Sequence, residues 1–354
     1  MGERDDTAGE LRRHWDAMVG LGRAMPGTGL AALGEGLQAS GPWPEDLRGC
    51  PLIVDTDIGG DADDALAVAV AARCVPQLAL VVTVDETGER HGHGQRARFA
   101  RWLLDAAGRP EVPVVAGAGT GDTAYYCVDG LIPPGVPEQG RDVVAAVRAV
   151  CAAADGPVRW VGMGPMSNLA QVIAQAPELA SRLRVTQMGG ALRYRHPDRA
   201  EHNIRLDVPA ARAVLQAVQD KRVAAPEFVT SEVTFTPSLE VTAASPLYRA
   251  LAAPDAPVWA RILTGHMDRW FAQFHPGTIQ HDALTLSAAL ELPFVDSDYL
   301  RITMDDIGRT TATADGVLVR VSLTAAYEAF MTWLLARLDP HAPAGTGTPI
   351  GAGR

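Results

Sequence analysis

A cluster of aspartates, DTDIGGDADD at residues 55–64, is the part of this sequence best suited to chemistry. Its carboxylates belong to Asp55, Asp57, Asp61, Asp63 and Asp64. Like charges crowded into one turn are unfavourable unless a cation neutralises them. Capping of a following helix accounts for one or two of these carboxylates but not for all, so the cluster predicts a metal site. A ligand set made only of oxygen atoms favours Ca²⁺ or Mg²⁺ over zinc.

The cluster lies where a short apolar run at residues 52–57 gives way to a helical pattern at residues 63–74. Side chains alternate along a strand, so Asp55 and Asp57 should point to the same side of the strand end. Asp63 and Asp64 should open the helix, whose positive dipole end favours carboxylates.

Apolar runs and helical patterns alternate through much of the chain. This alternation predicts an α/β fold, an open, mostly parallel, Rossmann-like sheet with helices on both faces. In such a sheet the ligand crevice lies beyond the carboxyl ends of the strands, so polar residues directly after each strand are candidates for a site. The predicted strands lie within residues 52–57, 78–84, 112–118, 158–164 and 183–190, and the predicted helices within residues 63–74, 96–108, 141–154 and 168–176.

The formal net charge is -11 and the pI is about 5.3. We therefore expect no nucleic acid and no membrane as a partner, because both would require a broad basic surface. The cysteines, Cys50, Cys74, Cys127 and Cys151, lack metal-binding spacing and indicate ordinary thiols in a reducing compartment. The N-terminus lacks an apolar stretch of signal-peptide length, which predicts a cytoplasmic protein.

The run DTDIGGDADDALAV resembles the signature of the inosine-uridine-preferring nucleoside hydrolase family, DxDPGxDD followed by a small apolar helix. Here Ile58 replaces the proline, and two extra residues precede the final aspartate pair. Later segments resemble further elements of that family in the same order. They are GMGPMSNLA at residues 162–170, MGGA and EHNI at residues 188–191 and 201–204, and QHDAL at residues 280–284.

This resemblance implies the nucleoside hydrolase fold and a Ca²⁺-dependent hydrolysis of the N-glycosidic bond of a ribonucleoside or related N-riboside. Base and ribose would be released through an oxocarbenium-like transition state, with Asp57 as general base and His281 near the leaving base. The implied metal ligands are Asp57, Asp64, Asp282 and the carbonyl of Met163. Glu201 and Asn203 are implied as ribose contacts, with Asp61 and Asp63 as alternative candidates for a further one.

Two departures from the family pattern concern the substrate. After the apolar run at residues 78–84 the family commonly has an asparagine that touches the ribose, whereas Glu86 or Thr87 lies nearest here. The stretch at residues 192–200 lacks an asparagine that helps to hold the 5′-hydroxyl. It carries arginines, a tyrosine and a histidine instead, which indicates a different 5′ group or base, including an anionic one.

We expect an N-terminal helical extension and connector at residues 1–49, a nucleoside hydrolase-like catalytic domain at residues 50–338 and a flexible C-terminal tail at residues 339–354. The expected partner is a small nucleoside or N-riboside, and a homo-oligomer, dimer or tetramer, is left open. One alternative is a catalytically silent riboside-binding protein. Another is a DxD-type phosphohydrolase, which would need a phosphate-binding lysine, and the single lysine is Lys221.

Overall fold

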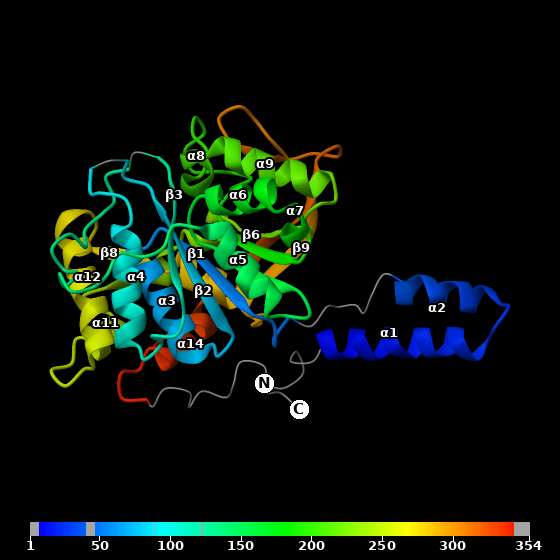
Figure 1. Cartoon of the computed structure of the whole chain (residues 1–354), viewed down its shortest axis with the longest axis horizontal. Coiled ribbons are helices and arrows are strands. Elements are labelled where there is room, and N and C mark those ends of the chain that lie inside the picture. Colours follow the sequence, from blue (N-terminus) through cyan, green and yellow to red (C-terminus); the bar gives the residue numbers. More distant parts are fainter. Residues whose placement is uncertain (1–6, 40–46, 89, 122, 343–354) are drawn as a thin grey trace. The chain divides into compact units, whose positions relative to one another are not determined.

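The first 49 residues form a unit of their own in the computed structural model, which describes residues 7–39, 47–88, 90–121 and 123–342. In this unit α1 (Thr7–Ala24) packs against α2 (Gly29–Ala39) as a helical hairpin (Figure 1). A Cβ atom on Gly22 would lie 2.8 Å from the Cα atom of Gly34, so two glycines permit this close packing. The sequence predicted one helix and a connector here. α2 was missed because its glycines have low helix propensity.

The second unit, residues 50–354, is built on a twisted sheet (Figure 1). In the part of the chain that the structure describes, this sheet has nine strands. Their order is β10 (Thr310–Ala312), β9 (Val295–Met304), β11 (Val317–Ala325), β6 (Glu227–Val229), β5 (Leu183–Met188), β4 (Val158–Gly162), β1 (Leu52–Thr56), β2 (Leu78–Asp85) and β3 (Val114–Gly119).

The direction in which successive strands are added to the sheet reverses at β1. β1 pairs in parallel with β2 on one side and with β4 on the other. The chain therefore runs outward from β1 through β2 to β3 and then returns to build β4, β5 and β6 on the opposite side. Such a switch point opens a crevice at the carboxyl ends of the two diverging strands. The predicted fold class is confirmed.

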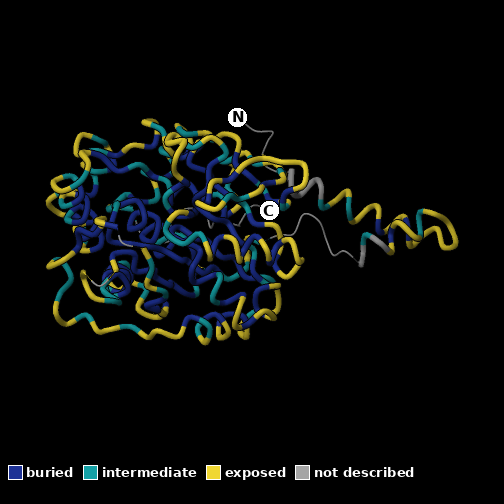
Figure 2. The backbone as a smooth tube through the Cα atoms, turned by 90° about the horizontal axis from the view of Figure 1, so that it is seen from above, coloured by how far each residue is buried: buried dark blue, intermediate teal, exposed yellow. Residues whose placement is uncertain are grey.

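Helices cover both faces of the sheet, and the central strands are buried between them (Figure 2). Leu52 and Val54 of β1 face one core and Ile53 faces the other, as the alternation of side chains along a strand requires. The first core receives side chains from α3 (Asp63–Cys74), α4 (Gln95–Ala106), α11 (Pro246–Leu251), α12 (Val258–Gln273), α13 (His281–Ala289) and α14 (Tyr327–Arg337). The second receives them from α5 (Val143–Ala152), α6 (Ser167–Gln175), α7 (Pro177–Ala180), α8 (His202–Leu206) and α9 (Val208–Gln219).

The C-terminal part of the sheet was not predicted. β11 continues the parallel order beside β6, but β9 and β10 add to it in antiparallel fashion. Smaller elements, α10 (Ser231–Thr234), the 3-10 helix η1 (Pro237–Leu239) and a two-stranded sheet of β7 (Glu240–Thr242) and β8 (Gly277–Ile279), lie between β6 and α13 in sequence. Of the expected tail, residues 343–354 lie outside the described residues. The Arg73 guanidinium donates to the carbonyls of Asp339 and Ala342.

A fully buried asparagine ties the strand ends together below the switch point. Asn168, in the first turn of α6, donates to a carboxylate oxygen of Asp55 at 2.7 Å and to the carbonyl of Thr83 at 3.2 Å. Its own carbonyl oxygen accepts from the backbone of Ala118 at 2.7 Å. One amide side chain thus links residues at the ends of β1, β2 and β3.

We expect Asn168→Ala to lower the free energy of unfolding by about 2–4 kcal/mol, because it leaves the buried Asp55 carboxyl and two backbone groups without their partner. Urea unfolding followed by circular dichroism measures this change. Gln171→Ala, half-buried on the same helix, is the matched control and should shift stability by less than about 0.5 kcal/mol. Equal effects from both substitutions would contradict this role for Asn168.

Candidate functional site

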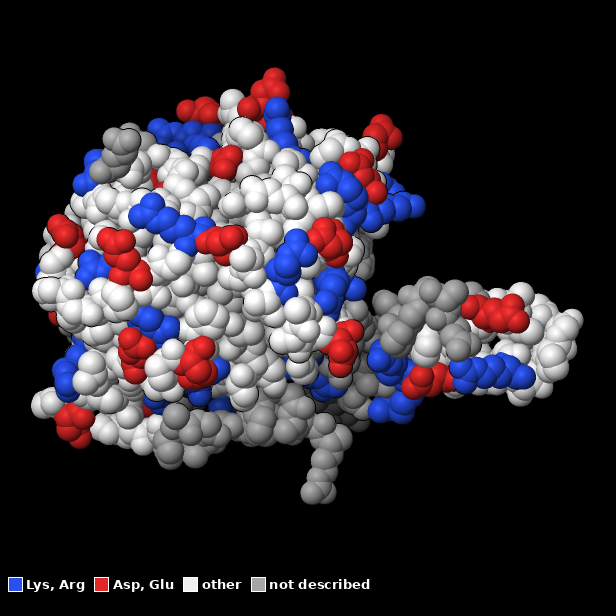
Figure 3. All heavy atoms as spheres, viewed as in Figure 1, with Lys and Arg blue, Asp and Glu red and all other residues white. Residues whose placement is uncertain are grey.

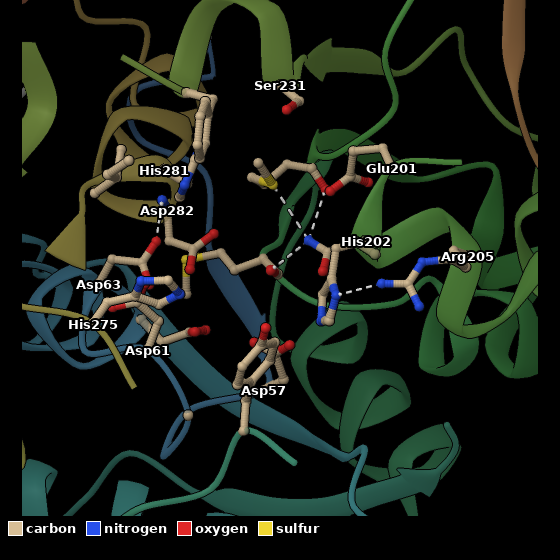
Figure 4. A pocket seen from close by; sticks show the side chains of 18 of the residues that line it. Asp57, Asp61, Asp63, Glu201, His202, Arg205, Ser231, His275, His281 and Asp282 are labelled. Carbon is tan, nitrogen blue, oxygen red and sulfur yellow. Dashed lines mark hydrogen bonds between the residues drawn. The ribbon is translucent and has the colours of Figure 1, made fainter. Parts of the chain in front are cut away.

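A cavity of about 570 Å³ lies at the carboxyl ends of β1 and β4. It is lined by all nine residues that the sequence analysis assigned to the site, and Figure 4 shows several of them facing one another across it. Asp63, His281 and Asp282 lie on one side, Glu201 and His202 lie on the other, and Asp57 lies between them (Figure 4). The nine are Asp57, Asp61, Asp63, Asp64, Met163, Glu201, Asn203, His281 and Asp282.

The turn after β1 brings its carboxylates back toward the strand end. The Thr56 hydroxyl donates to Asp64 and accepts from the backbone N–H of Ile58 at 3.2 Å. Gly59 has a φ of 110°, which favours glycine, and a Cβ atom on Gly60 would lie 2.9 Å from the Tyr125 carbonyl. The turn therefore needs both glycines before α3 can begin at Asp63.

Three predicted metal ligands come into direct contact. Side-chain hydrogen bonds connect Asp57 to Asp64 and Asp64 to Asp282. Carboxylate oxygens of Asp63, Asp64 and Asp282 lie within 4.8 Å of one another, and the backbone N–H of Asp282 donates to Asp63 at 3.3 Å. The two helices α3 and α13 thus bring the neighbouring carboxylates of Asp63 and Asp64 together with that of Asp282, which is 219 residues from Asp63 in the sequence.

The pKa values of these carboxyls show how unfavourable it is to bring them together in the ionised form. Burial, followed by repulsion from neighbouring carboxylates, raises the pKa of Asp64 and Asp282 well above the usual range. Burial and Asp64 raise the pKa of Asp63 to about 7. One oxygen of Asp282 is buried without a hydrogen-bond partner in the described part of the chain. An oxygen-only, strongly anionic donor set with an unused buried oxygen fits a hard divalent cation.

Asp55 lies behind this cluster rather than in it. It is buried, does not line the cavity, and accepts a hydrogen bond from Asn168. Burial raises its pKa to about 8, an effect that the Asn168 hydrogen bond opposes. Asp55 therefore lies outside the cavity and contacts α6 instead.

Asp61 and Asp63 both line the cavity but have different surroundings. Asp61 is half-buried, accepts from the backbone N–H of Ala62 at 2.6 Å and is hydrogen-bonded to the Thr278 side chain. Asp63 is only 3% exposed and lies against Asp64 and Asp282. Asp63, and not Asp61, therefore belongs to the carboxylate cluster with Asp64 and Asp282.

The opposite wall follows β5. Gly189 and Gly190 have φ values of 137° and 72°, so the chain turns sharply where L side chains are disfavoured. Glu201 accepts from the backbone N–H of Gly190 at 3.0 Å and caps α8 by accepting from Ile204 at 3.3 Å. These bonds use one oxygen of Glu201 and hold its carboxylate at the edge of the cavity.

Asn203 connects this wall to the end of β4. Its amide N–H group donates to the carbonyl of Met163 at 2.9 Å and to that of Met188 at 3.2 Å. The Met163 carbonyl, which the sequence analysis assigned to a metal, therefore also accepts a hydrogen bond. A carbonyl oxygen has a second lone pair, so the two roles are compatible.

A second group of side chains joins Asp57 to Glu86 and His202, two residues to which the sequence gave no definite role. Ligand atoms of Asp57, Glu86 and His202 lie within 4.8 Å of one another. Burial raises the pKa of Glu86, and the fully buried Arg96 guanidinium, 3.4 Å away, opposes this shift. Glu86 is the second residue after a predicted strand, and His202 stands between Glu201 and Asn203, so both carried a positional signal. Thr87, the other candidate there, does not line the cavity.

His281 lies in an aromatic and cationic environment. Its Nδ1 atom is 2.7 Å from the Thr234 hydroxyl, and its ring stacks on Phe235 with centroids 6.1 Å apart. Burial, with Arg195 and His202 acting in the same direction, lowers the pKa of His281 to about 3. The imidazole is therefore neutral near pH 7 and can act as a hydrogen-bond donor but not as an imidazolium acid.

The phosphohydrolase alternative lacks its lysine in this cavity. Lys221 is exposed, has a φ of 59° just after the end of α9, and does not line the cavity.

The described residues contain neither a disulfide bond nor a helix that could span a membrane. All four cysteines are free thiols. No helix there has both the length and the apolar character that crossing a bilayer requires.

Solved structures of nucleoside hydrolases share this fold. The plant nucleoside hydrolase PpNRh1 superposes with a TM-score of 0.66 at 20% identity, covering 82% of this chain and 99% of that one. The purine-preferring ribonucleoside hydrolase from Gardnerella vaginalis gives a TM-score of 0.64 at 21% identity, covering 82% and 98%. The chain therefore has the same fold as these two proteins.

Sequence comparison gives the family. The pyrimidine-specific ribonucleoside hydrolase RihA of Enterobacter sp. (strain 638) is 28% identical over 68% of this chain and 79% of that protein. The model of the family described as inosine-uridine preferring nucleoside hydrolase matches residues 52–337. The chain belongs to this family, so the predicted family and the predicted class of enzyme, an N-glycosyl hydrolase, are confirmed.

The raised pKa values predict how the metal-free protein responds to pH. A carboxyl whose pKa is raised in the folded state stabilises the fold fully below its unfolded pKa, and this stability is lost as the pH rises through the folded pKa. For Asp63 and Asp55 the folded values are about 7 and 8, against 3.8 unfolded. In EDTA we therefore expect Tm to fall by at least about 5 °C between pH 5 and pH 8.

Differential scanning fluorimetry with and without excess Ca²⁺ measures this effect. Because a cation binds the ionised carboxylates, it should raise Tm more at pH 8 than at pH 5. A Tm that rises with pH in EDTA, or a cation effect that is larger at pH 5, would contradict this account of the cluster.

Proposed function

We propose that this enzyme hydrolyses the N-glycosidic bond of a ribonucleoside or related N-riboside in a Ca²⁺-dependent reaction. The observation that carries the proposal is the meeting, in one cavity, of the buried carboxylates Asp57, Asp64 and Asp282 with the polar side chains of Glu201 and Asn203. A ribose has vicinal hydroxyls that suit such carboxylate and amide groups, and membership of the nucleoside hydrolase family supports the same assignment.

The metal would be held by oxygen atoms only. Asp57, Asp64, Asp282 and the carbonyl of Met163 are the proposed ligands, and the unused buried oxygen of Asp282 supports this set. When bound, Ca²⁺ lowers the pKa of a coordinated water and neutralises the carboxylates around it. No nitrogen or sulfur ligand is required, which favours Ca²⁺ over a transition metal.

The protein's own groups divide the remaining work. Asp57 accepts the proton of the attacking water as general base. Asp63, Glu201 and Asn203 hold the ribose hydroxyls, and their existing hydrogen bonds to Asp282, Gly190 and the carbonyl of Met163 fix their orientation. The surrounding carboxylates stabilise the positive charge that develops on the sugar as the bond to the base breaks.

His281 is proposed to act on the departing base as a neutral hydrogen-bond donor. Its low pKa and its contact with Thr234 support this role over that of an imidazolium acid. Trp270 also lines the cavity, with its indole N–H bonded to the Gly277 carbonyl at 3.0 Å, so its ring is fixed beside the site. The relatives named above differ between pyrimidine-specific and purine-preferring enzymes, so neither base is assigned to this chain.

A ribose-release assay tests this function directly. We expect at least one member of a panel of purine, pyrimidine and nicotinamide ribosides and their 5′-phosphates to release ribose or ribose phosphate. The release should stop in EDTA and return with excess Ca²⁺. Absence of cation-dependent release from every member of the panel would remove the proposal.

Variants assign the reaction to the cavity in the same assay. Asp57→Asn should lower kcat by about 10²–10⁴-fold, the usual contribution of a general base. Asp155→Asn, an exposed residue that does not line the cavity, is the matched control and should retain activity.

A second pair of variants separates the two candidate ribose contacts. We expect Asp63→Asn to lower kcat/KM by about tenfold or more, because a hydrogen bond to a charged group is lost, and Asp61→Asn to lower it by less than about threefold. Steady-state kinetics on the best substrate, with circular dichroism to verify folding, measure both. The opposite order of effects would assign the ribose contact to Asp61.

A further inference from the structure

The proposed ribose and metal groups are mostly acidic, but one part of the cavity wall is basic. The segment between β5 and the end of α8 contributes Arg195, Arg199 and Arg205 to the lining. All three are exposed, so their guanidinium groups are accessible to a ligand that enters from solvent. Arg205 lies beside His202 in Figure 4, on the same side of the cavity as Glu201.

No ion pair joins these arginines to a carboxylate among the described residues, although the positive charge of Arg205 acts on Glu86 and opposes the rise that burial causes in the pKa of that carboxyl. Arg195 donates to the Ser231 hydroxyl at 3.1 Å and lies 3.9 Å from the centroid of the Phe235 ring. Arg205 is 3.1 Å from the Nδ1 atom of His202. For the side chain of Arg199, the described part of the chain offers no hydrogen bond or ion pair.

Several arginines elsewhere on the surface form ion pairs with carboxylates. Arg212 pairs with Asp306 at 2.7 Å, Arg309 with Asp305 at 2.7 Å, and Arg148 with Glu178 at 2.8 Å. On the face shown in Figure 3, basic and acidic side chains are interspersed. In a chain with 42 acidic and 31 basic residues, three cavity arginines without an acidic partner are available for an anion from outside.

The three charges also act on one point. Burial raises the pKa of Tyr194. The positive charges of Arg195, Arg205 and Arg199 oppose that shift, and the Glu201 carboxylate adds to it. Tyr194 itself lines the cavity, and the Arg195 guanidinium lies 4.7 Å from its ring centroid. We call Arg195, Arg199 and Arg205 the arginine rim.

We propose that the arginine rim binds an anionic group of the substrate, a phosphate or a carboxylate, so that this enzyme prefers an anionic N-riboside to a neutral one. This inference rests on the proposed hydrolase function. A neutral riboside has no anionic group with which the three guanidinium groups could pair. An anionic riboside would be repelled by the carboxylates of this cavity if the guanidinium groups were absent. The anion has two sources, a 5′-phosphate on the ribose or a carboxylate on the base.

Uridine, uridine 5′-monophosphate and orotidine are suitable probes, because they share a ribose and a pyrimidine and differ in the anionic group. We expect kcat/KM for one of the two anionic probes to exceed that for uridine by about tenfold or more at low ionic strength. The anionic probe with the higher kcat/KM shows whether the arginine rim binds a 5′-phosphate or a carboxylate on the base. The preference should shrink as salt is added, because these charges are exposed.

Variants of the rim test the residues themselves. Arg195→Gln, Arg199→Gln and Arg205→Gln should each reduce the ratio of anionic to neutral kcat/KM by about fivefold or more and leave kcat/KM for uridine within about threefold. Arg193→Gln is the matched control, since Arg193 is exposed in the same segment and does not line the cavity. Equal turnover of all three probes by the wild type, or equal losses on all three probes in the rim variants, would overturn the proposal.

Calorimetric binding in the presence of Ca²⁺ separates this inference from the function on which it rests. If none of the probes is hydrolysed, the hydrolase proposal fails for these substrates. Binding affinity alone then tests whether the arginine rim binds an anion. Tighter binding of an anionic probe than of uridine, lost in the rim variants but kept in Arg193→Gln, would support the rim. Equal affinity for all three probes would reject it.

Discussion

The mutual repulsion of carboxylates at the end of β1 is the constraint on which the rest of this structure depends. Asp57, Asp64 and Asp282 share hydrogen bonds in a buried place, and burial raises the pKa of each. Carboxyls that repel one another do not remain together unless the surrounding chain holds them. Thr56 holds Asp64, the backbone of Asp282 holds Asp63, and Arg96 donates to the carbonyl of Asp57.

The fold offsets part of this repulsion through its helix termini. α3 begins at Asp63, α6 at Ser167 and α13 at His281, so three helices start beside the switch point. The positive end of a helix dipole favours a nearby carboxylate. Parallel strands followed by helices bring such termini to one edge of the sheet, which is why an acidic cluster can be buried at this place in the fold. A divalent cation would supply the remaining positive charge.

The parts of the molecule that the sequence predicted well are those set by local patterns. The strands at β1 to β5 and the helices at α3 to α6 follow from short apolar runs and helical periodicity, and the aspartate run marked the site itself. The antiparallel strands β9 and β10 were missed because they are largely exposed and lack a continuous apolar run. Asp61 and Asp63 could not be separated because they lie only two residues apart where the turn meets α3, and only tertiary contact with Asp282 distinguishes them.

The residues to which the sequence gave no definite role come mainly from loops. Glu86, His202 and the arginine rim reach the cavity through the path of the chain after β2 and β5, and no spacing rule fixes such paths. The side chains proposed for metal binding and proton transfer, by contrast, sit on strand ends and first helical turns, whose geometry follows from the sheet. Rigid elements therefore hold the groups that repel one another most strongly, because a loop could not keep them together. The groups proposed to contact the variable parts of a substrate do not belong to the carboxylate cluster, so they can lie on loops. Substitutions in those loops can change specificity without disturbing the cluster.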